Sequence, residues 1–217
     1  ASEQEEIQVE IVTDVKADML SDEMAIHVEL ENECYHNCEA FGIAFVSEEK
    51  TMYVPISHII SNDVVKDWLA DSSKKKLLAD SKAARSLLAR LNIDLNGVTF
   101  DLLLAAYIAN PAISGDDVAV IAKEFGYTQV ETNEAVYGKG AKWTKPDEET
   151  HAAHVARKAK AIWKLAPVLE EKLKANEQYD LYHDLELPLA RILAKMEICG
   201  VKVNVETFLR SKYIAMY

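Results

Sequence analysis

The sequence has few of the residues that mark specialised classes of protein. Among 217 residues there are three cysteines, five prolines and seven glycines. So few cysteines exclude a disulfide-rich scaffold, and so little proline and glycine excludes a collagen-like or low-complexity chain. The longest strongly apolar stretch, 102–109, is far shorter than the roughly 20 residues of a bilayer-spanning helix. The acidic start at Glu3, Glu5 and Glu6 does not resemble a secretion signal. We therefore expect a globular, cytoplasmic protein with no membrane partner.

Positive charge is scarce in one part of the chain only. Residues 1–50 hold 14 acidic residues against Lys16 and Lys50, which accounts for the whole net charge of −12. Residues 51–217 hold 22 acidic and 22 basic residues. Because nucleic-acid-binding surfaces are normally basic, the first quarter is a poor candidate for one unless its carboxylates hold metal ions.

The cysteines leave two interpretations open. Cys34 and Cys38 flank His36, whereas Cys199 is remote. A structural zinc site needs four ligands, usually as two close pairs, and His151 with His154 is the other close pair available. Reduced cysteines in a turn are the favoured interpretation, because the spacing alone does not supply a complete ligand set.

The pattern of apolar residues predicts strands first and helices later. Strict alternation, as in Met24, Ile26, Val28 and Leu30, is typical of a half-buried strand. The strands expected in this way are 7–12, 24–30, 40–46, 51–56, 77–79 and a short edge strand at 98–100. The helices expected from 3.6-residue spacing and capping residues are 63–70, 81–91, 101–109, 116–125, 147–175 and 181–198.

Several local features refine this prediction. Asn62 and Asp101 are suitable N-caps, residues 74–76 are read as a solvated lead-in, and 127–145 as a loop. Pro167 is expected to kink or split the long helix. Trp163 and Tyr107 have the spacing of core residues, although either ring could stack on a base. Together the elements predict an α/β fold with a mixed sheet.

Four collinear segments resemble a known family. They are Met24 to Glu29 followed by Gly42 to Ala44; Gly97 to Tyr107; Ala135 to Gly140; and Glu186 to Leu189 continuing to Met196, Glu197 and Gly200 to Val203. This order resembles the 3′–5′ exonuclease-like domain of bacterial DNA polymerase I, a family A DNA polymerase, and most closely its Bacillus-type members. The resemblance implies a ribonuclease H-like mixed sheet of about five strands flanked by helices. It divides the chain into an exonuclease-like domain, 1–176, and a truncated start of the polymerase (thumb) domain, 177–217.

The resemblance also implies where an active site would lie. Active members of the family remove nucleotides from a DNA 3′ end with two divalent cations held by carboxylates, because hard cations need anionic oxygen ligands. Placed on this sequence, the four motif positions fall at His27 and Glu29, at Ala84, and at Val155, with His151 at the position of the family's tyrosine. Only Glu29 is a carboxylate. His27 and Arg157 would add positive charge, so we expect no functional catalytic residue, no metal and no cofactor in this part of the protein.

Three functional hypotheses follow. The first is a non-catalytic, structural exonuclease-like domain whose parent protein extends DNA with a Mg²⁺-dependent polymerase domain as its partner. In that case the fragment itself is a monomer that binds DNA weakly or not at all. The second is an active two-metal exonuclease with relocated carboxylates, Glu29 and Asp80, the latter about one helical turn before Ala84. The third is a protein-interaction module that binds a basic partner through the acidic first quarter.

Overall fold

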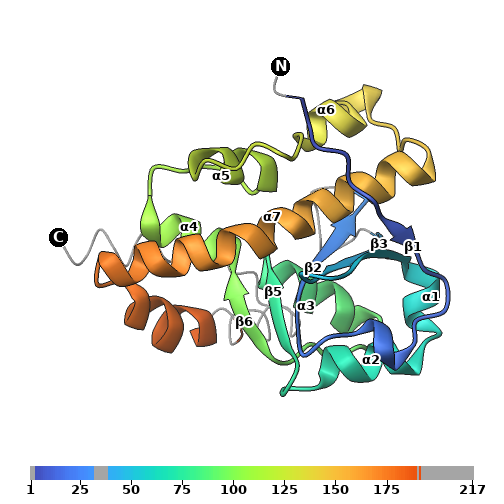
Figure 1. Ribbon diagram of the computed structural model, residues 1–217, viewed down its shortest axis with the longest axis horizontal. Helices are drawn as coiled ribbons and strands as arrows, with labels where there is room; N and C mark the ends of the chain where they lie inside the picture. The colour runs from blue at the N-terminus through green and yellow to red at the C-terminus, as the bar shows by residue number, and fades with distance from the viewer. Residues whose placement is uncertain (1–2, 32–38, 190, 192–217) are drawn as a thin grey trace.

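In the computed structural model, which describes residues 3–31, 39–189 and 191, a mixed sheet is sandwiched between helices (Figure 1). The strands lie in the order β1-β4-β3-β2-β5-β6. Their bounds are β1 Glu10–Ile11, β2 Glu23–Leu30, β3 Ala40–Val46, β4 Thr51–Pro55, β5 Lys75–Leu78 and β6 Val98–Asp101. β3 is antiparallel to both β2 and β4, whereas the pairs β1–β4, β2–β5 and β5–β6 are parallel. The expected mixed sheet is therefore confirmed, with a two-residue sixth strand at one edge.

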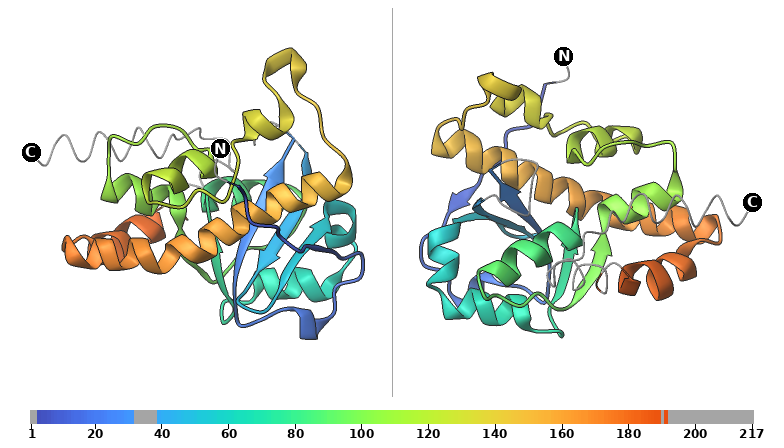
Figure 2. Two further views of the ribbon diagram at one scale, coloured as in Figure 1. Left: turned by 45° about the horizontal axis from the view of Figure 1, so that its top comes forward. Right: turned by 180° about the vertical axis from the view of Figure 1, so that it is seen from behind.

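Long and short helices cover the two faces of this sheet. One face carries α7 (Glu148–Ala175), which crosses β2, β3, β4 and β5. The other face packs against α1 (Ile56–Ile60), α2 (Asp63–Ala70) and α3 (Ser81–Arg90), and the view from behind in Figure 2 brings these helices forward. The remaining helical elements are α4 (Leu102–Ala109), α5 (Val118–Glu124), α6 (Asn133–Tyr137), and the short η1 (Ala17–Met19), η2 (Gly140–Lys142) and η3 (Leu181–Glu186).

Capping side chains set where several helices begin. The side-chain oxygens of Asn62, Asp80 and Asp101 accept hydrogen bonds from the backbone N–H groups two or three residues into α2, α3 and α4. Each cap satisfies a donor that has no partner within its own helix. The caps predicted at Asn62 and Asp101 are thus confirmed, and Asp80 is a third.

Two local predictions were wrong, and the split considered at Pro167 does not occur. The segment 127–145 contains α6 and η2 rather than loop alone. Lys76 is fully buried in β5, where its ammonium donates to the Asp71 carbonyl at 2.6 Å and lies over Trp68; burial lowers its pKa to about 8. Pro167 does not split α7, because the buried stripe on both sides of it, including Ile162 and Leu169, packs onto the sheet and α4.

The remaining sequence predictions concern two aromatic residues, the cysteines and membrane-spanning helices. Tyr107 is buried in the core, and Trp163 packs against it while its indole N–H donates to Glu48. Cys34, His36, Cys38 and Cys199 lie outside the described residues, as do positions 190 and 192–198 of the helix expected at 181–198, whose described part is helical. Within the described residues, no helix is long and apolar enough to cross a membrane.

Candidate functional site

Strand β2 presents His27 and Glu29 on the face that α7 covers. Successive strand residues point to opposite faces, so Ile26 and Val28 enter the core on the α2 and α3 side instead. Glu29 pairs across the ladder with Gly42 of β3. The sequence-predicted motif on the first long strand therefore does place both polar side chains on one side of the sheet.

Glu29 forms a buried ion pair with Lys158 of α7. The Lys158 ammonium donates to both carboxylate oxygens, at 2.8 and 3.0 Å. Lys158 is 1% exposed and Glu29 5% exposed. Burying either charge alone would carry a large desolvation cost, which the pairing offsets. Arg157, which was expected to add positive charge to the site, instead donates to the Glu5 carbonyl at the surface.

His27 lies beside this pair without a close hydrogen bond to it. Its Nε2 atom is 4.0 Å from one oxygen of Glu29. Burial lowers the pKa of His27 well below its usual range, and the positive charge of Lys158 lowers it further. The imidazole is therefore neutral at physiological pH, and Lys158 supplies the positive charge opposite Glu29.

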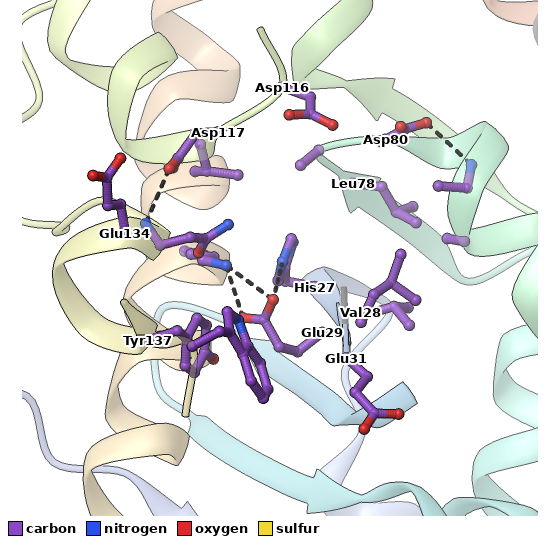
Figure 3. Close-up of a pocket in the computed structure, with 18 of the residues that line it drawn as sticks. His27, Val28, Glu29, Glu31, Leu78, Asp80, Asp116, Asp117, Glu134 and Tyr137 are labelled. Atoms are coloured by element: carbon purple, nitrogen blue, oxygen red, sulfur yellow. Dashed lines mark hydrogen bonds and ion pairs between the residues drawn. The ribbon is translucent and has the colours of Figure 1, made fainter. Parts of the chain in front are cut away.

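These residues line a pocket of about 900 Å³ between β2, α3, α7 and the segment that carries α6. Figure 3 shows His27 and Glu29 close together, with Asp80 and Asp116 at a separate part of the wall. Ala84 also lines the pocket and offers only a methyl group. The polar lining residues beyond these are Glu31, Asp117, Asn133, Glu134, Lys139 and Lys158.

Two of the wall carboxylates are engaged in structural hydrogen bonds. Asp80 caps α3 through the Ala83 N–H, and burial together with the charge of Asp101 raises its pKa to about 6. Asp117 accepts from the backbone N–H groups of Ala119 and Asn133, which ties α5 to α6. These carboxylates hold the ends of helices rather than converging on Glu29.

His151 and Val155, which the sequence placed in the cleft, lie elsewhere. Val155 is fully buried and packs with Ala44, Val46 and Tyr53 beneath β3 and β4. Neither residue is among those that line the pocket. The lysine at position 158 stands there instead, three residues further along the same helix. Because three residues rotate a helix by about 300°, the two positions face different neighbours.

His151 instead anchors an aromatic cluster behind the pocket. Its two ring nitrogens are each 3.0 Å from a tyrosine hydroxyl, of Tyr53 on one side and of Tyr137 on the other. Gly42 makes this possible, since a Cβ there would lie 2.6 Å from the Tyr53 ring. Gly138, at φ 85°, lets the chain turn back after α6, where a side chain would strike the Lys142 carbonyl. Both glycines belong to segments that carry the family resemblance.

Lys158 is the functional residue that the sequence reasoning missed. In the family motif, a residue with a ring side chain is followed four residues later by a metal ligand. On this helix that spacing fits two pairs equally well, His151 with Val155 and His154 with Lys158. The available signal was burial: a lysine on the same stripe as Val155, Ala159 and Ile162 must lie inside. A buried lysine needs a hydrogen-bonding partner, and Glu29 was an acidic residue within a predicted core strand.

His154 makes the stability of the protein depend on pH. Its Nε2 donates to the Asn133 side-chain oxygen at 2.9 Å, and burial, with the charge of Lys158, lowers its pKa to about 2. In the unfolded chain the imidazole protonates near pH 6.5. The unfolded state therefore gains a proton that the folded state lacks, and stability falls as the pH drops below 6.5.

We accordingly expect His154→Gln to lose less stability than the wild type between pH 7 and pH 5. Over this range the free energy of unfolding of the wild type should fall by about 2 kcal/mol more than that of the variant, because the relevant span is about 1.5 pH units at 1.36 kcal/mol each. Urea unfolding at the two pH values measures it. Equal losses in the two proteins would show that His154 titrates normally in the folded state.

The residues of the pocket do not fit a two-metal centre. Glu29 is neutralised by Lys158, and Ala84 has no ligand atom. Across residues 3–31, 39–189 and 191, no group of three or more His, Cys, Asp or Glu side chains is placed to hold a metal ion. Hard divalent cations need several oxygen ligands at once, so no chemical step is assigned to metals here.

Comparison with solved structures defines the class of fold. The nuclease NrnC of Brucella melitensis superposes with a TM-score of 0.71 at 12% identity, covering 89% of this chain and 95% of its own. RNase D of Escherichia coli gives a TM-score of 0.64 at 15% identity, covering 90% of this chain and 52% of its own. The chain thus has the ribonuclease H-like exonuclease fold.

Sequence comparison then defines the family within that class. The family model for the ribonuclease H-like domain of DNA polymerase I matches residues 26–165. DNA polymerase I of Geobacillus stearothermophilus is 46% identical over 194 residues, and that of Bacillus subtilis is 42% identical over 206 residues. These alignments cover 89% and 95% of this chain but 22% and 23% of the relatives. The chain belongs to the DNA polymerase I family and spans about a fifth of the length of these relatives.

Proposed function

We propose that this chain is a non-catalytic 3′–5′ exonuclease-like domain of a DNA polymerase I, which supports the polymerase domain of the same parent protein. The observation that carries the proposal is the Lys158 ammonium bonded to both oxygens of Glu29. A cation seeking Glu29 would have to displace an ammonium that is already neutralising it. Two divalent cations would also repel each other strongly without further carboxylates.

The remaining role is structural. The domain presents a folded surface to the chain that follows, while the parent protein synthesises DNA in replication and repair at a Mg²⁺-dependent site in another domain. The acidic first quarter favours weak or absent DNA binding by this domain alone, because phosphates repel carboxylates. The alternative of an exonuclease with relocated ligands is disfavoured by Asp80, whose oxygen caps α3.

A direct nuclease assay tests the proposal. The chain is incubated with a 5′-labelled single-stranded oligonucleotide and Mg²⁺ or Mn²⁺, and the products are separated by length. We expect no shortening of the 3′ end above a protein-free blank, and the same result for Glu29→Gln. Shortening that Glu29→Gln abolishes would overturn the proposal in favour of relocated ligands, and Asp80→Asn would then identify the second ligand.

A further inference from the structure

The segment after α7 reverses direction in a turn at Asn176 and Glu177. The chain leaves α7 at Asn176, and Glu177 adopts a left-handed conformation with φ 58°. The backbone N–H of Gln178 then donates to the Leu173 carbonyl at 2.7 Å, closing the end of the helix. A non-glycine residue in this conformation costs about 1 kcal/mol, so it persists where the surrounding contacts hold it. The turn directs the chain back along the domain.

The returning segment inserts Tyr182 into the core of the domain. Tyr182 is fully buried and packs in the cluster formed by α4, β6 and α7. Its ring meets Phe100 edge-on, with the centroids 6.3 Å apart. Tyr179 and Leu187 pack against the same cluster, and the Gln178 side chain donates to the Ile108 carbonyl. In Figure 1 this orange segment lies beside α4 and β6.

The contact of Tyr182 falls on an edge of the sheet. β6 is the last strand in the sheet order, so within the described part of the chain its outer side has no strand partner. The Asp101 backbone N–H, at the end of β6, donates to the Tyr182 hydroxyl at 2.8 Å. Exposed strand edges are sites of unwanted pairing, and native proteins cover them with other segments. The Tyr182 hydroxyl thus accepts the hydrogen bond of an N–H group at the edge of the sheet.

A second contact lies near the other end of the same strand. Arg191 approaches the side-chain oxygen of Asn96, just before β6, at 3.4 Å. The segment therefore contacts the end of β6 through Tyr182 and the residues just before β6 through Arg191.

Asp101 connects this edge to the wall of the pocket. One of its carboxylate oxygens accepts from both the N–H and the hydroxyl of Ser81, at 2.9 and 2.6 Å, and the other accepts from the Leu104 N–H. Ser81 is the first residue of α3, next to Asp80, which lines the pocket. A single residue therefore links the starts of α3 and α4 with Tyr182.

We propose that residues 178–187 are an edge clamp of the ribonuclease H-like domain, which closes β6 and fixes the direction in which the chain continues. The clamp moves the inferred domain boundary from residue 176 to after Leu187. Its partners are α4 and the end of β6 in the same chain. The clamp goes beyond the proposed function and does not depend on whether the pocket is catalytic.

Hydrogen exchange on the 217-residue chain tests the hydrogen bond of the clamp. Tyr182→Phe keeps the ring and removes the hydroxyl. We expect the Asp101 amide to exchange about three- to tenfold faster, the effect of losing one net hydrogen bond, while the Ile43 amide in β3 keeps its wild-type rate. Unchanged exchange at Asp101 would overturn the contact, and equal acceleration at Ile43 would indicate global loosening and overturn a local clamp.

Limited proteolysis under native conditions tests the docking of the whole segment. In Tyr182→Ala we expect chymotrypsin to cut after Tyr179 at least tenfold faster than in the wild type. Asp184→Ala is the matched control, since that side chain is exposed and lies outside the cluster around Tyr182, so it should leave the rate unchanged. Wild-type cleavage in a folded Tyr182→Ala would overturn the clamp. If Tyr182→Ala does not fold, the exchange measurement on Tyr182→Phe decides.

Discussion

Replacing Lys158 by methionine is expected to lower the free energy of unfolding by about 3–5 kcal/mol, the usual effect of removing one partner from a buried ion pair. Methionine nearly matches the length of lysine, so the loss comes from charge rather than from an empty space. Glu29, 5% exposed, would be left without its cation. Urea denaturation of the wild type and the variant at pH 7 measures the difference.

A double-mutant cycle separates the ion pair from simple repacking. Glu29→Gln together with Lys158→Met removes both charges, so we expect the double variant to be clearly more stable than Lys158→Met alone. Lys164→Met is the matched control, because that lysine lies on the exposed side of the same helix and should change stability by less than about 0.5 kcal/mol. Additive effects of Glu29→Gln and Lys158→Met would contradict the pairing.

Local rules predicted most of the fold because they act on neighbouring residues. Alternation in Met24 to Leu30 predicted β2, and the polar residues Asn62 and Asp101 predicted two helix starts. The order and direction of the strands, including the antiparallel β3 between β2 and β4, depend on pairing between segments that the local patterns do not connect. The strand predicted at 7–12 was too long, since β1 spans Glu10–Ile11, where it pairs with β4.

The site was predicted less well because it depends on rotation about a long helix. A four-residue spacing on α7 fits two pairs of positions. The sequence analysis placed the ligand position at Val155, which packs beneath β3 and β4, whereas Lys158 is the residue that contacts Glu29 of β2. Lys76 and Tyr182 show the same limit. Each looks like a surface or linker residue along the sequence, yet each is buried by partners from distant elements, Trp68 for one and Phe100 for the other.

The acidic first quarter takes on a more definite meaning beside these contacts. Among the described residues of this quarter, Glu29 and Glu31 line the pocket, and Glu29 is paired with Lys158. Glu3, Glu5 and Glu6 are exposed. The pocket is lined by six carboxylates, of Glu29, Glu31, Asp80, Asp116, Asp117 and Glu134, against the two lysines Lys139 and Lys158. Glu29 therefore differs from the other acidic residues of the pocket in its buried pairing with Lys158 and not in a lack of negative charge around it.

Placing carboxylates around Glu29 is expected to create a metal site in the pocket. We expect the triple variant His27→Asp, Ala84→Asp and Lys158→Asp to bind Mn²⁺, because all three positions line the pocket with Glu29. Binding to the folded state alone stabilises a protein by about 2.7 kcal/mol at a metal concentration 100 times the dissociation constant. Calorimetric titration with Mn²⁺, and thermal unfolding with and without it, measure the gain.

The matched control keeps the lysine. In the double variant His27→Asp and Ala84→Asp, the Lys158 ammonium still occupies both oxygens of Glu29, so we expect little or no stabilisation by Mn²⁺. A gain as large as that of the triple variant would mean that the lysine does not block the site, and the charge argument would fail. No gain in the folded triple variant would mean that the three positions do not converge on Glu29. A gain confined to the triple variant would identify Lys158 as the residue that occupies the place of the metal.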